Sequence, residues 1–258
     1  MWRLILPVFF ALLVFVACNN HNAENHYAEG EHSEAHGEHD GDLSDEHDGD
    51  PADEHDGHNH NHDDDANAHM HKTPFEELVK RFEEPGRDDW QQPKKVVAMM
   101  GNLAGKTVAD IGVGTGFFAF PLAEAGAKVI AIDIDQRFLD YVDAKKNKME
   151  SQPAIELRLA KEDDPLLKKD EADHAIIVNT YHHIHNRKAY FAGVRNDLKE
   201  GGSLWVVDFR KKELPMGPPV EMKMSAETVE KELLAAGYSK VTIDRSSLAY
   251  QYIVVAEK

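Results

Sequence analysis

The chain has 258 residues, of which 41% are apolar, enough for one sizeable folded domain with additional segments. Its net charge is −18, but residues 19–71 hold 17 acidic residues and no Lys or Arg, whereas residues 73–258 hold 27 basic and 30 acidic residues. The larger part is therefore close to neutral. It has no excess of the basic residues that nucleic-acid binding requires, so no nucleic-acid partner is expected.

The first 18 residues resemble a bacterial export signal. Arg3 precedes the apolar run Leu4–Val16, which at 13 residues is short for a membrane span. The segment Phe15-Val-Ala-Cys18 resembles the lipobox of bacterial lipoproteins, with phenylalanine where leucine is usual. We therefore predict a signal peptide over residues 1–17 and lipidation of Cys18, which would anchor the protein on the periplasmic side of a bacterial membrane. The alternatives are an ordinary signal peptide, a short uncleaved anchor, and an unused signal that leaves the protein cytoplasmic.

Residues 18–72 form a segment rich in His, Asp and Glu. Residues 19–71 hold 12 of the 16 histidines and few apolar residues, so this segment cannot bury enough surface to offset the entropy of ordering. It is predicted to be a disordered tether. Imidazole and carboxylate groups together suit loosely bound Zn, Ni or Cu(II), and the alternative is an acidic spacer that binds no metal. No single histidine is assigned as a metal ligand.

The folded domain is predicted to span residues 73–258 and to begin with a short helix. Thr73 is expected as the N-cap of this helix and Pro74 as its first residue. A polar loop is expected over Glu83–Gln92, followed by a second amphipathic helix that Pro93 opens.

Short apolar runs then alternate with helical stretches, which is the pattern of a mostly parallel sheet with helices on both faces. The expected strands are Thr107–Ile111, Val129–Ile132, Ile155–Leu159, Ala175–Val178 and Leu204–Val207. Leu198–Gly202 is expected to end a helix and turn the chain. After a helix near Ala226–Ala236, strands over Lys240–Arg245 and Ala249–Ala256 are close enough to pair antiparallel. The predicted fold class is α/β.

A glycine-rich loop follows the first of these strands. Gly112, Gly114 and Gly116 lie between the strand and the next helix, where a backbone without side chains lets a ligand approach closely. Asp110 precedes them, and its carboxylate would repel a pyrophosphate but suits a ligand with an ammonium and a sulfonium. Asp133, at the end of the next strand, has the position from which a carboxylate accepts hydrogen bonds from ribose hydroxyls.

A dinucleotide fingerprint would require glycine at position 117, where phenylalanine stands. The segments DIGVGTG, AIDID and LKEGG instead resemble motifs of the class I S-adenosylmethionine-dependent methyltransferases, nearest to the small-molecule branch that includes quinone-biosynthesis enzymes. The resemblance covers roughly Phe75 to Lys258. It implies a Rossmann-like, seven-stranded, mostly parallel sheet with an antiparallel C-terminal hairpin, and S-adenosylmethionine as cofactor. It also implies that Asp110 and the three glycines surround the methionine part and that Asp133 binds the ribose. An acid after the third strand would bind the adenine amino group: Asp163 is the candidate, with its neighbours Glu162 and Asp164 as the alternatives.

Polar side chains follow the fourth strand in the segment VNTYHHIHN. Because ligands bind beyond the carboxyl ends of parallel strands, Asn179 is expected near the cofactor and Tyr181 near the substrate. Either His182 or His183 is expected to accept the proton of the methyl acceptor. The alternative is that one of these histidines faces the site while the others cap the next helix or face solvent. A metal site is not expected here, because adjacent histidine side chains point apart.

Asp208 ends the fifth strand and is expected either to orient the substrate or to pair with Arg210 or Lys211. Arg87 and Trp90 resemble the N-terminal lid of this family branch and are expected to contact the substrate. The alternative for Trp90 is packing against the first helices.

These features predict an exported, lipid-anchored methyltransferase that acts on a small-molecule acceptor. Export conflicts with the cofactor, because S-adenosylmethionine is made in the cytoplasm. The alternative is therefore an exported, non-catalytic binding module with a metal-binding His-rich tether. The intact glycine loop and Asp133 favour the enzyme, since a module without a nucleotide has no use for them.

Overall fold

The computed structural model describes Met70 and residues 72–258, so the predicted signal peptide, Cys18 and nearly all of the His-rich segment lie outside the described residues. The helices are α2 (Phe75–Phe82), α3 (Arg87–Gln91), α4 (Pro93–Met99), α5 (Ala119–Glu124), α6 (Gln136–Lys146), η1 (Tyr181–His183), α7 (Arg187–Asp197), η2 (Val220–Met222) and α8 (Ala226–Ala235). The strands are β1 (Thr107–Ile111), β2 (Lys128–Asp133), β3 (Ile155–Leu159), β4 (Ala172–Val178), β5 (Leu198–Phe209), β6 (Lys240–Asp244) and β7 (Gln251–Glu257). Within this part of the chain, no helix is both long and apolar enough to cross a membrane.

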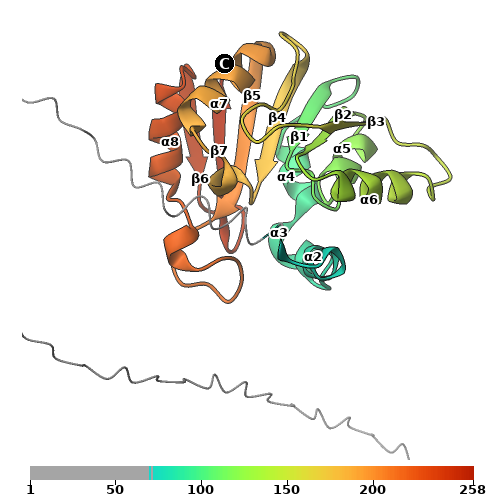
Figure 1. Ribbon diagram of the computed structural model, residues 1–258. Helices are drawn as coiled ribbons and strands as arrows, with labels where there is room; N and C mark the ends of the chain where they lie inside the picture. Colours follow the sequence, from blue (N-terminus) through green and yellow to red (C-terminus); the bar gives the residue numbers. More distant parts are fainter. Residues whose placement is uncertain (1–69, 71) are drawn as a thin grey trace, which may run out of the picture. The chain divides into compact units, whose positions relative to one another are not determined.

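The strands form one seven-stranded sheet in the order β3-β2-β1-β4-β5-β7-β6 (Figure 1). Strands β1 to β5 pair in parallel, whereas β7 runs antiparallel to both β5 and β6. This arrangement confirms the predicted Rossmann-like sheet with its antiparallel C-terminal hairpin. The strand order reverses between β1 and β4, so the carboxyl ends of these two strands border the crevice where open α/β sheets bind their ligands.

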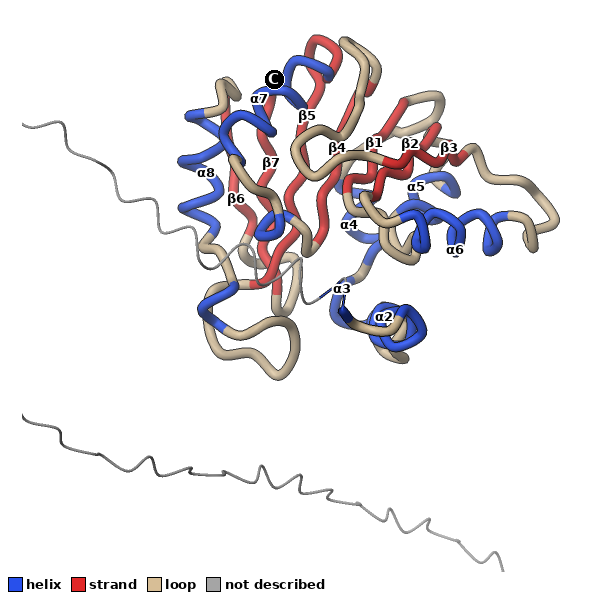
Figure 2. Tube along the Cα trace, in the orientation of Figure 1, coloured by secondary structure: helices blue, strands red, loops and turns tan. Residues whose placement is uncertain are grey.

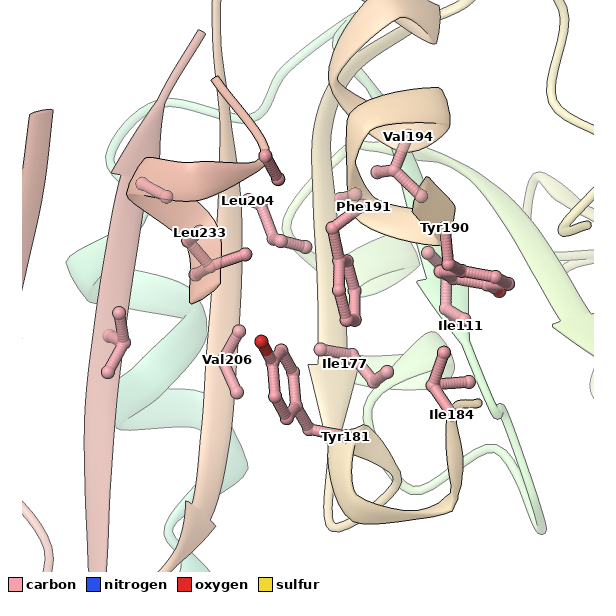
Figure 3. Packing of buried hydrophobic residues seen from close by; sticks show 14 of the residues in the cluster. Ile111, Ile177, Tyr181, Ile184, Tyr190, Phe191, Val194, Leu204, Val206 and Leu233 are labelled. Atoms are coloured by element: carbon pink, nitrogen blue, oxygen red, sulfur yellow. The ribbon is translucent and has the colours of Figure 1, made fainter. Parts of the chain in front are cut away.

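Helices cover both faces of the sheet because the central strands are apolar on both sides (Figure 2). Ile177 of β4 lies in a core cluster with Phe191 of α7 and Leu233 of α8 (Figure 3). Its neighbour Ile176 lies in a second cluster with residues of α4, α5 and α6. Burying each such side chain contributes roughly 1.5–3 kcal/mol to the free energy of unfolding. The two clusters therefore fix the positions of the central strands, whose carboxyl ends border the crevice.

The N-terminal part differs from the prediction in two ways. Helix α2 begins at Phe75 with Pro74 as its N-cap and has no side-chain cap hydrogen bond, so the prediction of Thr73 as N-cap was wrong by one residue. The segment Glu83–Gln92 was predicted as a loop but contains helix α3. This helix has only five residues, which is too short for a periodic apolar pattern to announce it.

The segment Leu198–Gly202 was predicted as a helix end and turn, and it is the first part of β5. Helix α7 ends at Asp197, and Leu198 already pairs with Ala172 of β4 before the register shifts. Pairing with β4 resumes at Ser203, opposite His174, so the glycines and charges between Leu198 and Ser203 lie in an irregularity of the strand.

Candidate active site

The glycine loop between β1 and α5 needs glycine for its backbone and for its contacts. Gly112, Gly114 and Gly116 have φ of +75°, +51° and +81°, values that side chains disfavour. A Cβ on Gly112 would lie 2.6 Å from the side chain of Thr180, and one on Gly116 would lie 2.8 Å from the ring of Phe120. The loop is thus packed tightly against the segment that follows β4, which brings the two sides of the crevice together.

Helix α2 covers this loop. The ring of Phe82 lies 3.5 Å from the place where a Cβ on Gly114 would stand. Phe82 also stacks on Phe138 of α6, with ring centroids 5.5 Å apart, and Phe75 contacts the edge of the same ring at 5.1 Å. Helix α2 is therefore anchored by aromatic contacts over the carboxyl ends of β1 and β2.

Two buried carboxylates lie at the ends of these strands. Asp110 is 2% exposed, and its Oδ2 is buried without a hydrogen-bond partner. Burial, together with the nearby charge of Asp133, raises the pKa of Asp110 to about 7, while Arg87 opposes the shift. The carboxylate of Asp133 accepts hydrogen bonds from the backbone N–H groups of Gly114 and Asp135, both at 3.0 Å, and burial nevertheless raises its pKa to about 6. Both carboxyl groups thus have pKa values near neutral pH. A cationic ligand bound beside them would stabilise their ionised forms.

Arg87 supplies the opposite charge beside the loop. Its Nε donates to Oε1 of Gln91 at 2.6 Å, its Nη1 donates to the carbonyl of Phe82 at 2.5 Å, and its guanidinium lies 4.0 Å from the ring centroid of Phe117. Burial lowers its pKa to about 10, and Asp110 is among the carboxylates that act against this shift. The predicted lid residue is thus part of the wall of the glycine-loop site.

Three buried polar atoms near this wall have no hydrogen-bond partner. They are Oδ2 of Asp110, Oγ1 of Thr115 and Nε2 of Gln91. An unpaired buried polar group is costly in a folded protein and calls for a ligand or an ordered water. The set combines an anionic acceptor with hydroxyl and amide donors, and the guanidinium of Arg87 lies beside it. This combination fits a ligand that carries both an ammonium and a carboxylate, as the methionine part of the expected cofactor does.

The residues that follow β4 take different positions. Asn179 has a φ of +54°, and its Oδ1 accepts a hydrogen bond from Nε2 of Gln251 at 2.7 Å. Tyr181 is fully buried, stacks on Phe191 with ring centroids 4.6 Å apart, and donates its hydroxyl to Oε2 of Glu232 at 2.8 Å (Figure 3). Tyr181 is therefore a core residue, in place of the substrate contact that the sequence suggested.

The histidines and Asp208 come together at the carboxyl ends of β4 and β5. His182 is 8% exposed, and its Nδ1 lies 3.3 Å from Oδ2 of Asp208, which is 1% exposed. The rings of His182 and His183 have centroids 4.3 Å apart, and burial, then the charge of His182, lowers the pKa of His183 to about 4. No group of metal-ligating side chains with the geometry of a metal site occurs among the described residues. The His182–Asp208 pair resembles the orienting pair of a general base.

Asp208 does not pair with either predicted cation. Its Oδ1 accepts the backbone N–H of Phe209 at 2.7 Å, whereas Arg210 donates to backbone carbonyls, including that of Gln251 at 3.1 Å. The ring of Trp90 lies 5.6 Å from that of Phe209, so the second lid residue reaches the end of β5. The structure therefore adds Phe209 to the site, a residue that the sequence did not distinguish from core because it continues an apolar strand.

Asp163 is exposed in the turn that follows β3, where Lys161 and Asp164 form an isolated bridge. This is the edge at which the adenine end of the cofactor was expected, and the assignment of Asp163 stays a prediction. Gln91 and Thr115 were missed by the sequence analysis. Gln91 lies in the segment taken for a loop, and Thr115 was passed over because the glycines on either side of it carry the motif.

Comparison with known proteins identifies the type of domain. Residues 109–206 match the family model described as "Methyltransferase domain". A solved S-adenosylmethionine-dependent methyltransferase from Aquifex aeolicus superimposes with a TM-score of 0.65 at 26% identity, covering 72% of this chain and 99% of that structure. The described residues therefore include a match to a methyltransferase domain and share the fold of an S-adenosylmethionine-dependent methyltransferase.

Relatives of known activity differ in what their names say they act on. The tRNA U34 carboxymethyltransferase of Pseudomonas paraeruginosa is 31% identical over 134 residues, which are 52% of this chain and 41% of that protein. The demethylmenaquinone methyltransferase of Tropheryma whipplei is 32% identical over 111 residues, which are 43% of this chain and 45% of that protein. The chain spans less than half the length of either relative, so neither match decides the acceptor.

Proposed function

We propose that this protein transfers the activated methyl group of S-adenosylmethionine to a small-molecule acceptor bound at the carboxyl ends of β4 and β5. The observation that carries the proposal is the buried, unpartnered carboxylate of Asp110 beside the glycine loop, with the guanidinium of Arg87 close enough to act on its pKa. The cofactor, when bound, supplies a methyl group on a positively charged sulfur. An in-line transfer of this kind depends mainly on alignment in a pocket without water.

The residues of the site divide between the two ends of the methionine part. Asp110 attracts the ammonium and the sulfonium, while Arg87 and the amide of Gln91 offer donors to the carboxylate. Asp133 keeps its bonds to backbone N–H groups and has further lone pairs for the ribose hydroxyls. Asp163 is our candidate for the adenine amino group.

His182 is our candidate for the general base. Donation of its Nδ1–H to Asp208 leaves Nε2 as the acceptor for a proton from the methyl acceptor. The low pKa of His183 keeps its imidazole neutral near neutral pH, so it places no positive charge beside His182. The rings of Trp90 and Phe209 provide an apolar wall beside this pair, as a planar acceptor would need.

A small-molecule acceptor is favoured over a nucleic acid by charge. Residues 73–258 hold 27 basic against 30 acidic residues, and binding of a polyanion relies on a positive surface. The tRNA activity of the Pseudomonas relative makes tRNA the comparison acceptor in the test.

The first test is calorimetric titration of S-adenosylmethionine and of NAD into the full-length protein. We expect micromolar affinity for S-adenosylmethionine and no heat with NAD, and absence of binding by the methyl donor would refute the proposal. Release of S-adenosylhomocysteine is then measured with unmodified tRNA and with small phenols and quinols. Turnover of tRNA alone would contradict the assignment of the acceptor.

We also propose that the protein is exported and lipid-anchored through Cys18. The resemblance of the first 18 residues to a lipoprotein signal supports this proposal. Replacement of Cys18 by serine should move the protein from the membrane fraction of bacterial cells to the soluble fraction. Equal distribution of both proteins would exclude the anchor.

A non-catalytic module is disfavoured, because a buried carboxylate without a ligand destabilises the fold and serves no structural contact.

A further inference from the structure

The segment between β5 and α8 carries a buried lysine beside the candidate active site. Lys223 is 3% exposed, and its Nζ donates to the carbonyl of Lys212 at 3.0 Å. The same Nζ lies 6.0 Å from the ring centroid of Phe209, the last residue of β5. A lysine ammonium is therefore held at the carboxyl end of the central parallel strands.

This ammonium lacks a counter-charge in the described part of the chain. It has three N–H donors, of which one is used by the carbonyl of Lys212, and no carboxylate forms an ion pair with it there. Lysine side chains are almost never fully buried unless they are paired, because removing the charge from water is unfavourable. The two remaining donors of Lys223 are thus suited to an anion that comes from outside the chain.

The surroundings of Lys223 connect it to the place of reaction. The ring of Phe209 contacts Trp90 at 5.6 Å, and the residue before Phe209 is Asp208, which holds His182. Gly217 lies against the same ring, since a Cβ there would come within 2.9 Å of it at a φ of +86°. The segment that carries Lys223 is thereby fixed on the end of β5, and Figure 1 shows it at the same end of the sheet as α3.

We propose that Lys223 binds an anionic group of the methyl acceptor, so that the acceptor is a small aromatic acid. Its carboxylate would accept hydrogen bonds from Nζ of Lys223, and its ring would pack against Phe209 and Trp90. That this anion is the methyl acceptor rests on the function proposed above. The anion site rests only on the burial and missing counter-charge of the lysine.

The test compares benzoate with benzamide, which has the same shape and no charge, by calorimetric titration into the full-length protein with S-adenosylhomocysteine present and absent. We expect benzoate to bind about tenfold more tightly than benzamide, the effect of one charge-assisted hydrogen bond. In Lys223→Gln the two affinities should agree within about twofold, whereas Lys223→Arg should keep most of the preference. Lys211→Gln, an exposed lysine of the same segment, is the matched control and should behave as the unaltered protein.

Equal binding of benzoate and benzamide by the unaltered protein, or binding of neither, would overturn the proposal without any variant. Retention of the preference in Lys223→Gln would overturn it as well. Circular dichroism and titration with S-adenosylmethionine are run on each variant, because Lys223→Gln should keep its fold and its affinity for the methyl donor. Failure of S-adenosylmethionine to bind the unaltered protein would refute the proposed function alone, since the benzoate preference is measured independently.

Discussion

Replacement of Asp110 by asparagine should stabilise the free protein at pH 8 and weaken its binding of S-adenosylmethionine. Burial raises the pKa of Asp110 to about 7, against 3.8 for the same carboxyl in an unfolded chain. Between these pH values the folded protein retains a proton that the unfolded chain has lost, so the free energy of unfolding falls as the pH rises. A difference of about three pKa units corresponds to about 4 kcal/mol, which is the upper limit of what the neutral amide gains at pH 8.

The effect on binding has the opposite sign. The ammonium and the sulfonium of the cofactor lose an ionised partner, and one charge-assisted interaction is worth about 1.5–3 kcal/mol, or roughly 10- to 150-fold in Kd. Urea unfolding of the ligand-free protein at pH 5.5 and pH 8 measures the first effect, and calorimetry at pH 8 measures the second. Asp140→Asn, at an exposed position of α6, is the control and should change neither quantity by more than about 0.5 kcal/mol.

Two results would refute this reasoning. A variant that is less stable than the unaltered protein at pH 8 would mean that the Asp110 carboxylate makes structural contacts that its geometry does not show. An unchanged affinity for S-adenosylmethionine would mean that the carboxylate does not face the cofactor. The expected pattern of gained stability and lost affinity is therefore specific to a charge that is kept for a ligand.

Two further predictions concern the glycine loop and the histidine pair. Gly112→Ala should lower the free energy of unfolding, measured by chemical denaturation, by roughly 1–3 kcal/mol more than the control Gly105→Ala. Gly105 has a similar φ of +73° but open space around it, whereas a Cβ on Gly112 would collide with the side chain of Thr180. Equal losses would assign the whole cost to the backbone conformation. Asp208→Asn should reduce kcat by about 10- to 100-fold, because His182 loses the carboxylate that orients its ring, while the affinity for S-adenosylmethionine stays within about twofold. An unchanged kcat would show that the pair does not act on the proton.

The sheet could be predicted from the sequence because its strands are buried on both faces. The run Val129–Ile132 within β2 is apolar at every position, and the helices between such runs supply the spacing of parallel connections. The ends of the strands were less accessible. Leu198 enters β5 because the backbone of Ala172 in β4 offers it a partner, whereas the glycines and charges after it favour a turn. The local sequence indicates only the conformation that a segment prefers in isolation. Here pairing with β4 determines the conformation of Leu198 instead.

The site was predictable where chemistry demands particular residue types and less so where packing positions them. Asp110 and Asp133 stand out because carboxylates at the ends of buried strands have few structural uses. Tyr181 did not stand out as a core residue, since its neighbours are polar and its burial depends on the turn of η1 toward Glu232 of α8. Helix α3 was missed for a related reason, because contacts such as that of Trp90 with Phe209 fix it rather than its own periodicity.

The buried charges of this domain share one location and one weakness. Asp110, Asp133, Asp208 and Lys223 each retain 9% or less of their exposed surface, and they lie at or beside the carboxyl ends of the parallel strands. The carboxylates of Asp110 and Asp133, whose pKa values are raised by burial, and the ammonium of Lys223, which has no counter-charge among the described residues, all reduce the stability of the empty protein. Packing does not require them, because apolar residues would fill the same space at less cost. Charges that oppose folding persist only where a ligand offsets them, and the opposite signs of Asp110 and Lys223 require two: a cationic methyl donor at β1 and an anionic acceptor at β5.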